Sequence, residues 1–314
     1  MKRNVNHVRP LFRPARIAAY PPEPRASQVG APVHRKLAAE ALCEQRRRRR
    51  WGIFFKFVAV LYFGLLIATL YSDKLTDGLD ESAPHVALVN LEGEIGPDGE
   101  ASAKRINASL RAAFDNDSAK AVLLRINSPG GSPVQSALIN EEMTRLRAAH
   151  PDKPLYAVVE EICASGGYYV AVAADQIYVS KASLVGSIGV IMNGFGFTGT
   201  MDKLGVERRL ITAGENKGFL DPFSAPVPFQ EEYARTMLAD IHQQFIDAVK
   251  EGRGERLKNA PELFSGLVWT GQKGVELGLA DGFGSVQSVA RDVVKLEDIR
   301  DYTQEDSFAE RFAK

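Results

Sequence analysis

Residues 164–169 have the sequence Ala-Ser-Gly-Gly-Tyr-Tyr, and Ala-Ala-Asp follows at residues 173–175. A serine followed by two glycines and a short apolar run is typical of a residue at the start of a helix. In that position Ser165 presents its hydroxyl and its backbone amide together, as a nucleophile must. A serine that only caps a helix has the same local sequence, so the neighbouring motifs must decide between the two.

The sequence on both sides of Ser165 alternates between short apolar segments and helical patterns. Strands are expected at residues 86–91, 121–126, 155–159, 176–179 and 207–212. Helices are expected at residues 102–114, after 132 through 150, directly after 165, before 207, at 229–251 and at 271–279, with a turn at 280–284. This alternation predicts an α/β fold with a mostly parallel sheet and right-handed crossover helices.

Residues 51–71 are apolar apart from Lys56. A helix of this length can cross the hydrocarbon core of a bilayer, which is about 30 Å thick. Five arginines at residues 46–50 precede it and favour a cytoplasmic N-terminus. We therefore expect one uncleaved transmembrane helix, with the rest of the chain outside the cytoplasm. A cleaved signal peptide is the alternative, but it would have a shorter basic region and a shorter apolar core.

The formal net charge of the 314-residue chain is zero, but residues 1–50 carry +10 and the remainder −10. The first segment is rich in Arg and Pro without an apolar period, so we expect a disordered cytoplasmic tail. A linker at 72–84, a catalytic domain at 85–295 and a charged C-terminal tail at 296–314 complete the expected organisation. The arginine run alone would also fit nucleic acid, but its place beside the apolar stretch favours a lipid bilayer and no nucleic-acid partner.

The chain contains two cysteines, Cys43 and Cys163. They lie on either side of the expected membrane span, so we expect no disulfide between them. Cys163 lies two residues before Ser165 and is an alternative nucleophile, although its apolar neighbours favour a buried structural role.

Few histidines follow the membrane span. His85, His150 and His242 belong to no metal-binding motif and are expected at surface or capping positions, so we expect no metal and no other cofactor. They are also weak candidates for the base of a Ser-His-Asp triad.

A neutral lysine is another base that can activate a serine. The ordinary lysine pKa of about 10.4 makes neutrality at pH 7 cost about 4.6 kcal/mol, which burial or a neighbouring positive charge must supply. Lys217 is our candidate, because it lies in a glycine-flanked loop with Phe219, Leu220 and Phe223 nearby to exclude water. A solvated surface lysine is the alternative.

The sequence Asn-Ser-Pro-Gly-Gly-Ser at residues 127–132 follows a strand that should be buried. Glycine lets the main chain approach a substrate closely, so an amide of Gly130-Gly131 can bind an oxyanion, with the amide of Ser165 as a second donor. Pro-Gly-Gly is also an ordinary turn, so this motif is weak alone.

Four motifs, taken in order, resemble the signal peptide peptidase A family of membrane-anchored Ser-Lys peptidases, family S49. They are Asn-Ser-Pro-Gly-Gly at 127–131, the segment 164–175, Gly-Ser-Ile-Gly-Val at 186–190 and the loop 214–217. The resemblance covers about residues 85–290 and implies a Clp protease/crotonase-like fold. It implies Ser165 as nucleophile, Lys217 as general base, Ser187 as a hydroxyl that orients the lysine, and Gly131 as an oxyanion donor.

The resemblance also implies a partner and a location. Short members of the family with one repeat, like this chain, form ring-shaped homo-oligomers in which serine and lysine come from neighbouring subunits. The expected substrates are cleaved signal peptides or similar apolar peptides, cut outside a bacterial inner membrane.

Two other functions remain possible for such a sequence. A crotonase-type acyl-CoA enzyme would use the Gly-Gly amides on a thioester enolate, but it needs a cytoplasmic domain. A non-catalytic membrane scaffold would keep the fold and lose the nucleophile or the base, and both are present here.

Overall fold

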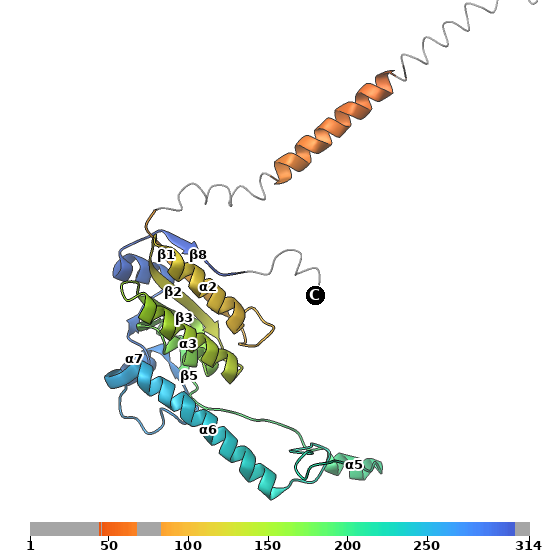
Figure 1. The fold of residues 1–314 in the computed structure, drawn as a ribbon, viewed down its shortest axis with the longest axis vertical. Helices are drawn as coiled ribbons and strands as arrows, with labels where there is room; N and C mark the ends of the chain where they lie inside the picture. Colours follow the sequence, from red (N-terminus) through yellow and green to blue (C-terminus); the bar gives the residue numbers. More distant parts are fainter. Residues whose placement is uncertain (1–43, 45, 68–82, 305–314) are drawn as a thin grey trace, which may run out of the picture. The chain divides into compact units, whose positions relative to one another are not determined.

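The computed structural model describes residue 44, residues 46–67 and residues 83–304. It divides the chain into two units, residues 1–79 and 80–314 (Figure 1). In the first unit, Arg46–Ile67 form an exposed helix that is long and apolar enough to cross a membrane. The rest of the expected span, at 68–71, lies outside the described residues, as do most of the N-terminal tail with Cys43 and most of the linker.

The second unit contains a sheet in which every strand pair is parallel except one. The order is β6-β5-β3-β2-β1-β8, with β4 beside β3 and β7 beside β4, and only β5 and β6 are antiparallel. The strands are β1 His85–Glu92, β2 Ala119–Ser128, β3 Leu155–Ala164, β4 Gln176–Val179, β5 Leu184–Gly186, β6 Val268–Thr270, β7 Gly282–Phe283 and β8 Ile299–Asp301. The predicted parallel α/β fold is confirmed.

The helices cover the sheet and extend from it. They are α2 Ala103–Asp115, α3 Pro133–Ala149, α4 Gly166–Ala171, α5 Thr198–Leu204, α6 Pro228–Arg253, α7 Gly271–Leu277 and α8 Val286–Ser288, followed by a π-helical turn Val289–Val294. The main core contains apolar side chains of α2, α3 and α4 together with the sheet. A smaller apolar cluster on Val86, Leu123 and Val158 packs against the α8 region.

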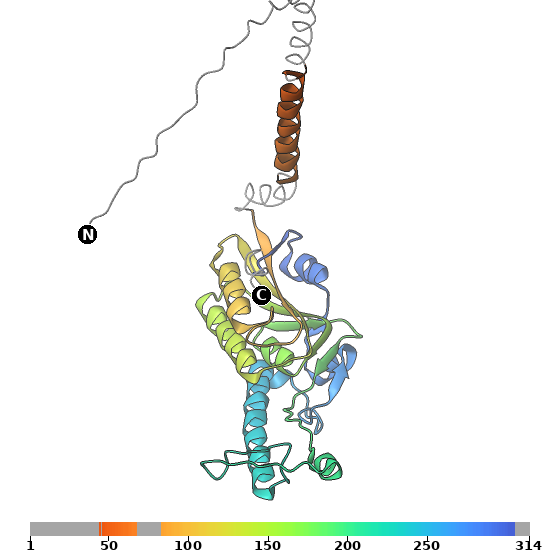
Figure 2. The same cartoon turned by 90° about the vertical axis from the view of Figure 1, so that its right-hand side faces the viewer.

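The helix α6 is anchored to the core by its C-terminal half only. Phe245 and Val249 are buried there, and Arg253, 1% exposed, forms a bidentate ion pair with Asp281. The other half projects away from the sheet and carries the segment around α5 at its far end (Figures 1 and 2). We call residues 191–241 the arm. At its base, His242 Nε2 lies 3.1 Å from the carbonyl oxygen of Ile188.

Several boundaries differ from the sequence predictions. Residues 207–212 form no strand and are exposed, so that prediction is wrong, because a strand needs a hydrogen-bonded partner and no strand lies beside this segment in residues 83–304. The predicted turn at 280–284 contains β7, which pairs with β4. The strand β8, which pairs with β1, falls within the segment 296–314 that the sequence assigned to a tail.

Candidate active site

The strand β3 ends at Ala164, and Ser165 makes the sharp turn into α4. Its backbone has φ +52° and ψ −123°, which is an unfavourable conformation for a residue with a side chain. The carbonyl of Ser165 accepts the amide of Tyr169, so the helix begins there, but its side chain makes no capping hydrogen bond. Ser165 is thus the N-cap residue of α4 by position, as the sequence allowed, but its half-buried hydroxyl does not cap the helix.

The loop after β2 lies directly against Ser165. Gly130 has φ +103°, and a Cβ atom added to it would lie 2.7 Å from both Gly166 N and Ser165 Cβ. The hydroxyl of Ser128 holds the loop in place, because it donates to Gly93 O at 2.6 Å and accepts from Gly130 N at 3.1 Å. Glycine is required here by close approach as well as by φ.

The structure corrects one predicted oxyanion donor. The amide of Ser165 donates to the carbonyl of Gly186 at 2.9 Å, so it is already used. Within residues 83–304, the amides of Gly131 and Gly166 have no intramolecular acceptor. A Cβ on Gly166 would lie 3.3 Å from Gly131 N, so these two residues are neighbours. The pair of free amides beside Ser165 therefore belongs to Gly131 and Gly166, and Gly166 was not among the predicted donors.

Ser187 follows the strand β5, whose Gly186 is paired with Ala164 of β3. It is half-buried, has φ +52°, and donates its amide to Leu267 O at 2.8 Å. The structure thus brings Ser165, Gly131 and Ser187 to the carboxyl ends of three adjacent strands.

Lys217 is not part of this group within one chain. It is exposed and lies in a turn on the arm, where its amide donates to Gly214 O. Three residues later, Leu220 N donates to Gln230 Oε1 near the start of α6. The helix α6 contacts Ile188, the neighbour of Ser187, through His242. His242 lies about 18 Å from Gln230 along the helix, which rises 1.5 Å per residue. The expected shielding of Lys217 by its aromatic neighbours is absent in the single chain.

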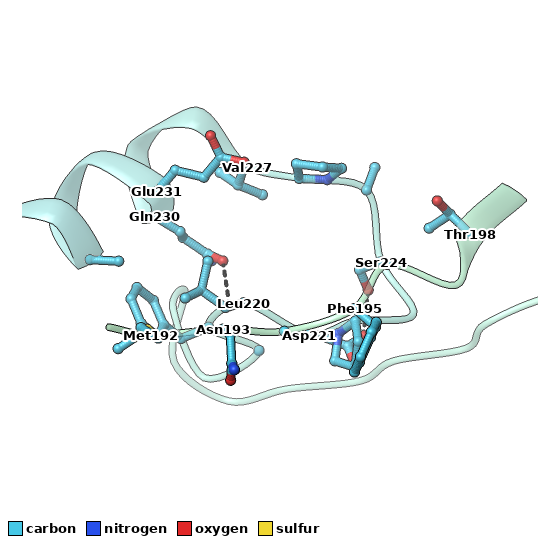
Figure 3. Close-up of a pocket in the computed structure, with 18 of the residues that line it drawn as sticks. Met192, Asn193, Phe195, Thr198, Leu220, Asp221, Ser224, Val227, Gln230 and Glu231 are labelled. Carbon is cyan, nitrogen blue, oxygen red and sulfur yellow. Dashed lines mark hydrogen bonds between the residues drawn. The ribbon is translucent and has the colours of Figure 1, made fainter. Parts of the chain in front are cut away.

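The arm contains a pocket of about 820 Å³ beside the Lys217 loop (Figure 3). Its walls are formed by residues 192–196, 198, 218–222 and 224–227, and Gln230, Ala234 and Leu238 of α6 contribute its floor. Gln230 is 8% exposed, and its bond to Leu220, which has φ +51°, fixes one wall. Phe197 stacks on Phe223 at 5.2 Å between ring centroids. The pocket is lined by both apolar and polar residues, and its polar residues include Asp221, Glu231 and Arg235.

The other candidate groups have structural positions. Cys163 is fully buried, and burial raises the pKa of its thiol, so the thiolate needed for nucleophilic attack is disfavoured. His85 is buried at the start of β1, so its predicted surface or capping position is wrong, and its ring nitrogens lie within hydrogen-bonding distance of Ala83 O and the Tyr302 hydroxyl. In the part of the chain that the structure describes, no cluster of three or more His, Cys, Asp or Glu side chains is placed to hold a metal ion.

The comparisons with known proteins show the family of this chain. The model of peptidase family S49 matches residues 147–300. A putative signal peptide peptidase SppA from Enterococcus faecium is 30% identical over 243 residues, which are 74% of this chain and 70% of that relative. The chain belongs to peptidase family S49.

Two further similarities concern proteins with other names. A Na⁺/H⁺ antiporter NhaA from Brucella melitensis is 47% identical over 192 residues, which are 60% of this chain. The chain spans about a quarter (26%) of that relative's length, and the name describes the longer protein. A solved structure of a mutant of the membrane-bound stomatin-specific protease 1510-N, in complex with a substrate peptide, has a TM-score of 0.42 and 14% identity, covering 74% of this chain and 97% of that one.

Proposed function

We propose that this chain is a serine endopeptidase in which Ser165 is the nucleophile and Lys217 the general base, with short apolar peptides such as cleaved signal peptides as substrates. One observation carries the proposal. Ser165 lies on a strained turn beside the free amides of Gly131 and Gly166, and its hydroxyl makes no capping hydrogen bond to the helix. Membership of peptidase family S49 and the relative named signal peptide peptidase support it.

In this mechanism Ser165 Oγ attacks the carbonyl carbon of the scissile peptide bond. Lys217, as the neutral amine, accepts the proton of the hydroxyl and then gives it to the leaving amine, and water hydrolyses the acyl-enzyme. The amides of Gly131 and Gly166 stabilise the oxyanion of each tetrahedral intermediate. Ser187 accepts or donates a hydrogen bond that orients the lysine amine.

The base acts from a neighbouring copy of the chain. Lys217 is exposed in the single chain, and a lysine base works in a site that excludes water, so Lys217 needs a cover that the single chain does not provide. The arm also exposes large apolar side chains, among them Ile191 at 82%, Phe195 at 81% and Ile211 at 95%. Exposed apolar surface of this kind is typical of an interface. A ring-shaped homo-oligomer would cover the arm and bring Lys217 to the adjacent Ser165.

The substrates follow from the pocket beside the Lys217 loop. The volume of the pocket is in the range of sites for small ligands. One of its wall segments begins at Gly218, one residue after the proposed base. An apolar side chain of the peptide near the scissile bond would fill it. The helix Arg46–Ile67 would anchor the protein in a bacterial inner membrane, with the basic N-terminus in the cytoplasm. The catalytic domain, outside the cytoplasm, would then meet signal peptides released from the bilayer.

The test uses the full-length protein in detergent with a fluorophosphonate probe and a synthetic signal peptide. Ser165→Ala should lose both labelling and turnover, whereas Ser109→Ala, at a buried serine on α2, should keep both. Lys217→Ala should also lose both, whereas Lys203→Ala, at an exposed lysine on the same arm, should not.

Turnover by Ser165→Ala at the wild-type rate would refute the mechanism. If coenzyme A then raised the melting temperature, the acyl-CoA alternative would replace it. Wild-type protein that neither labels nor cleaves peptides would favour the scaffold.

A further inference from the structure

The strand β6 clamps the turn that carries Gly186 and Ser187. It runs antiparallel to β5, with Trp269 opposite Val185 and Val268 opposite Gly186. The residue before β6, Leu267, accepts the amide of Ser187 at 2.8 Å. The turn is therefore held by β3 on one side, through Ser165, and by β6 on the other.

The indole of Trp269 occupies the space beside Gly186 where a side chain would lie. A Cβ atom on Gly186 would be 2.9 Å from Trp269 Cδ1 and 3.2 Å from Leu267 O, and Gly186 has φ +102°. Two features therefore require glycine at this position: the positive φ angle and the packing of the indole against the backbone.

The environment of the indole nitrogen indicates that packing, and no hydrogen bond of the indole, holds Trp269 in place. Trp269 Nε1 is buried and has no hydrogen-bond partner among residues 83–304, and Trp269 packs against the main core. A buried donor without a partner is unfavourable, because it has lost its bond to water. The ring is kept in this position by its packing, since no polar interaction compensates for the loss.

We infer that Trp269 is a positioning residue for the nucleophile, an inference that rests on the proposed role of Ser165. The ring fixes the backbone of Gly186, whose carbonyl oxygen accepts the amide of Ser165 at 2.9 Å. This hydrogen bond helps to hold Ser165 at φ +52°, and it points the Ser165 amide away from the substrate, so that the Gly166 amide is the one beside Gly131. Loss of the ring frees Gly186, and Ser165 relaxes toward a more favourable φ.

The experiment compares full-length variants in detergent at a temperature well below the melting temperature of each. Trp269→Ala should lower kcat and the rate of Ser165 labelling by at least about tenfold, with KM changed by less than about threefold. Trp269→Phe keeps an aromatic carbon at the position of Cδ1 and removes the unbonded N–H, so its kcat should stay within about threefold of wild type. Phe114→Ala, which removes a buried ring on α2, is the stability control and should keep the wild-type labelling rate.

Two outcomes overturn the inference. If folded Trp269→Ala keeps the wild-type labelling rate, the ring does not position Ser165. If Trp269→Phe loses as much as Trp269→Ala, an aromatic carbon beside Gly186 does not hold the turn and the packing argument is wrong. Failure of the proposed function is distinguishable, because wild-type protein would then be labelled no more than Ser165→Ala.

Discussion

A mixture of two inactive variants would recover activity if the base comes from a neighbouring copy. The variants are Ser165→Ala, which keeps the lysine, and Lys217→Ala, which keeps the serine. Within one chain the Lys217 loop is attached to the start of α6 through Leu220 and Gln230, about 18 Å along the helix from the contact beside Ser187. Neither variant alone can form a complete site.

The expected recovery follows from counting sites. In the proposed ring each site would take its serine from one subunit and its lysine from the next. With random equal mixing, about one quarter of the sites combine a serine from a Lys217→Ala subunit with a lysine from a Ser165→Ala subunit. The mixture should therefore show about a quarter of the wild-type rate, and a base from the same chain predicts none.

The assay is co-expression of the two full-length variants with different affinity tags, followed by tandem purification and cleavage of a synthetic signal peptide. Mixing Ser165→Ala with Lys203→Ala is the matched control and should give about half of the wild-type rate, because every lysine is then intact. Mixed oligomers without activity, beside an active control, would refute the idea that the lysine acts between subunits.

Three other predictions concern single positions. Gly130→Ala places a Cβ atom 2.7 Å from Gly166 N and should abolish labelling of Ser165, which normal labelling of the variant would contradict. Asp281→Asn leaves the buried Arg253 guanidinium without its carboxylate and should lower the free energy of unfolding by about 3 to 5 kcal/mol, measured by urea denaturation; a loss below about 1 kcal/mol would show that Arg253 is compensated elsewhere. Arg145 and then Arg111 lower the pKa of Glu142 from 4.5 to about 2, so the stabilisation is present above pH 4.5 and fades as the pH falls toward 2. Glu142→Gln should thus be about 1 to 2 kcal/mol less stable than wild type at pH 7 and equally stable near pH 2, whereas a difference independent of pH would point to packing.

The long elements could be predicted from sequence because their own periodicity specifies them. The helix predicted at 102–114 is found at Ala103–Asp115, and the helix predicted at 229–251 is found at Pro228–Arg253. The short strands β5, β6 and β8 were not predicted, because three residues carry no usable pattern and their pairing depends on the rest of the sheet. The error at 207–212 has the same origin, since alternating apolar residues form a strand only beside a partner.

The positions of Ser165 and Gly131 could be predicted in part because each follows a predicted strand, whereas Ser187 follows β5 and was found only through the family resemblance. In a parallel sheet the carboxyl ends of the strands meet at one edge. The choice between the amides of Ser165 and Gly166 could not be predicted, because it depends on the φ angle of Ser165 and on the bond to Gly186, which lies 21 residues away. The sequence shows a glycine at position 166 but not why glycine is needed there. In the folded chain any side chain at this position would collide with the Ser136 hydroxyl.

The arm shows why Lys217 was harder to place than Ser165. The apolar residues near Lys217 suggested a buried base, and in the single chain these side chains leave the lysine exposed. Hydrophobic sequence predicts burial, but it does not say whether the covering surface belongs to the same chain. The proposed mechanism requires a neutral lysine amine, and the arm exposes apolar side chains. Both therefore need a covering surface that the single chain does not supply. A second copy that covers the arm would supply it, because the surface that buries Ile191 and Phe195 would exclude water from the lysine loop as well.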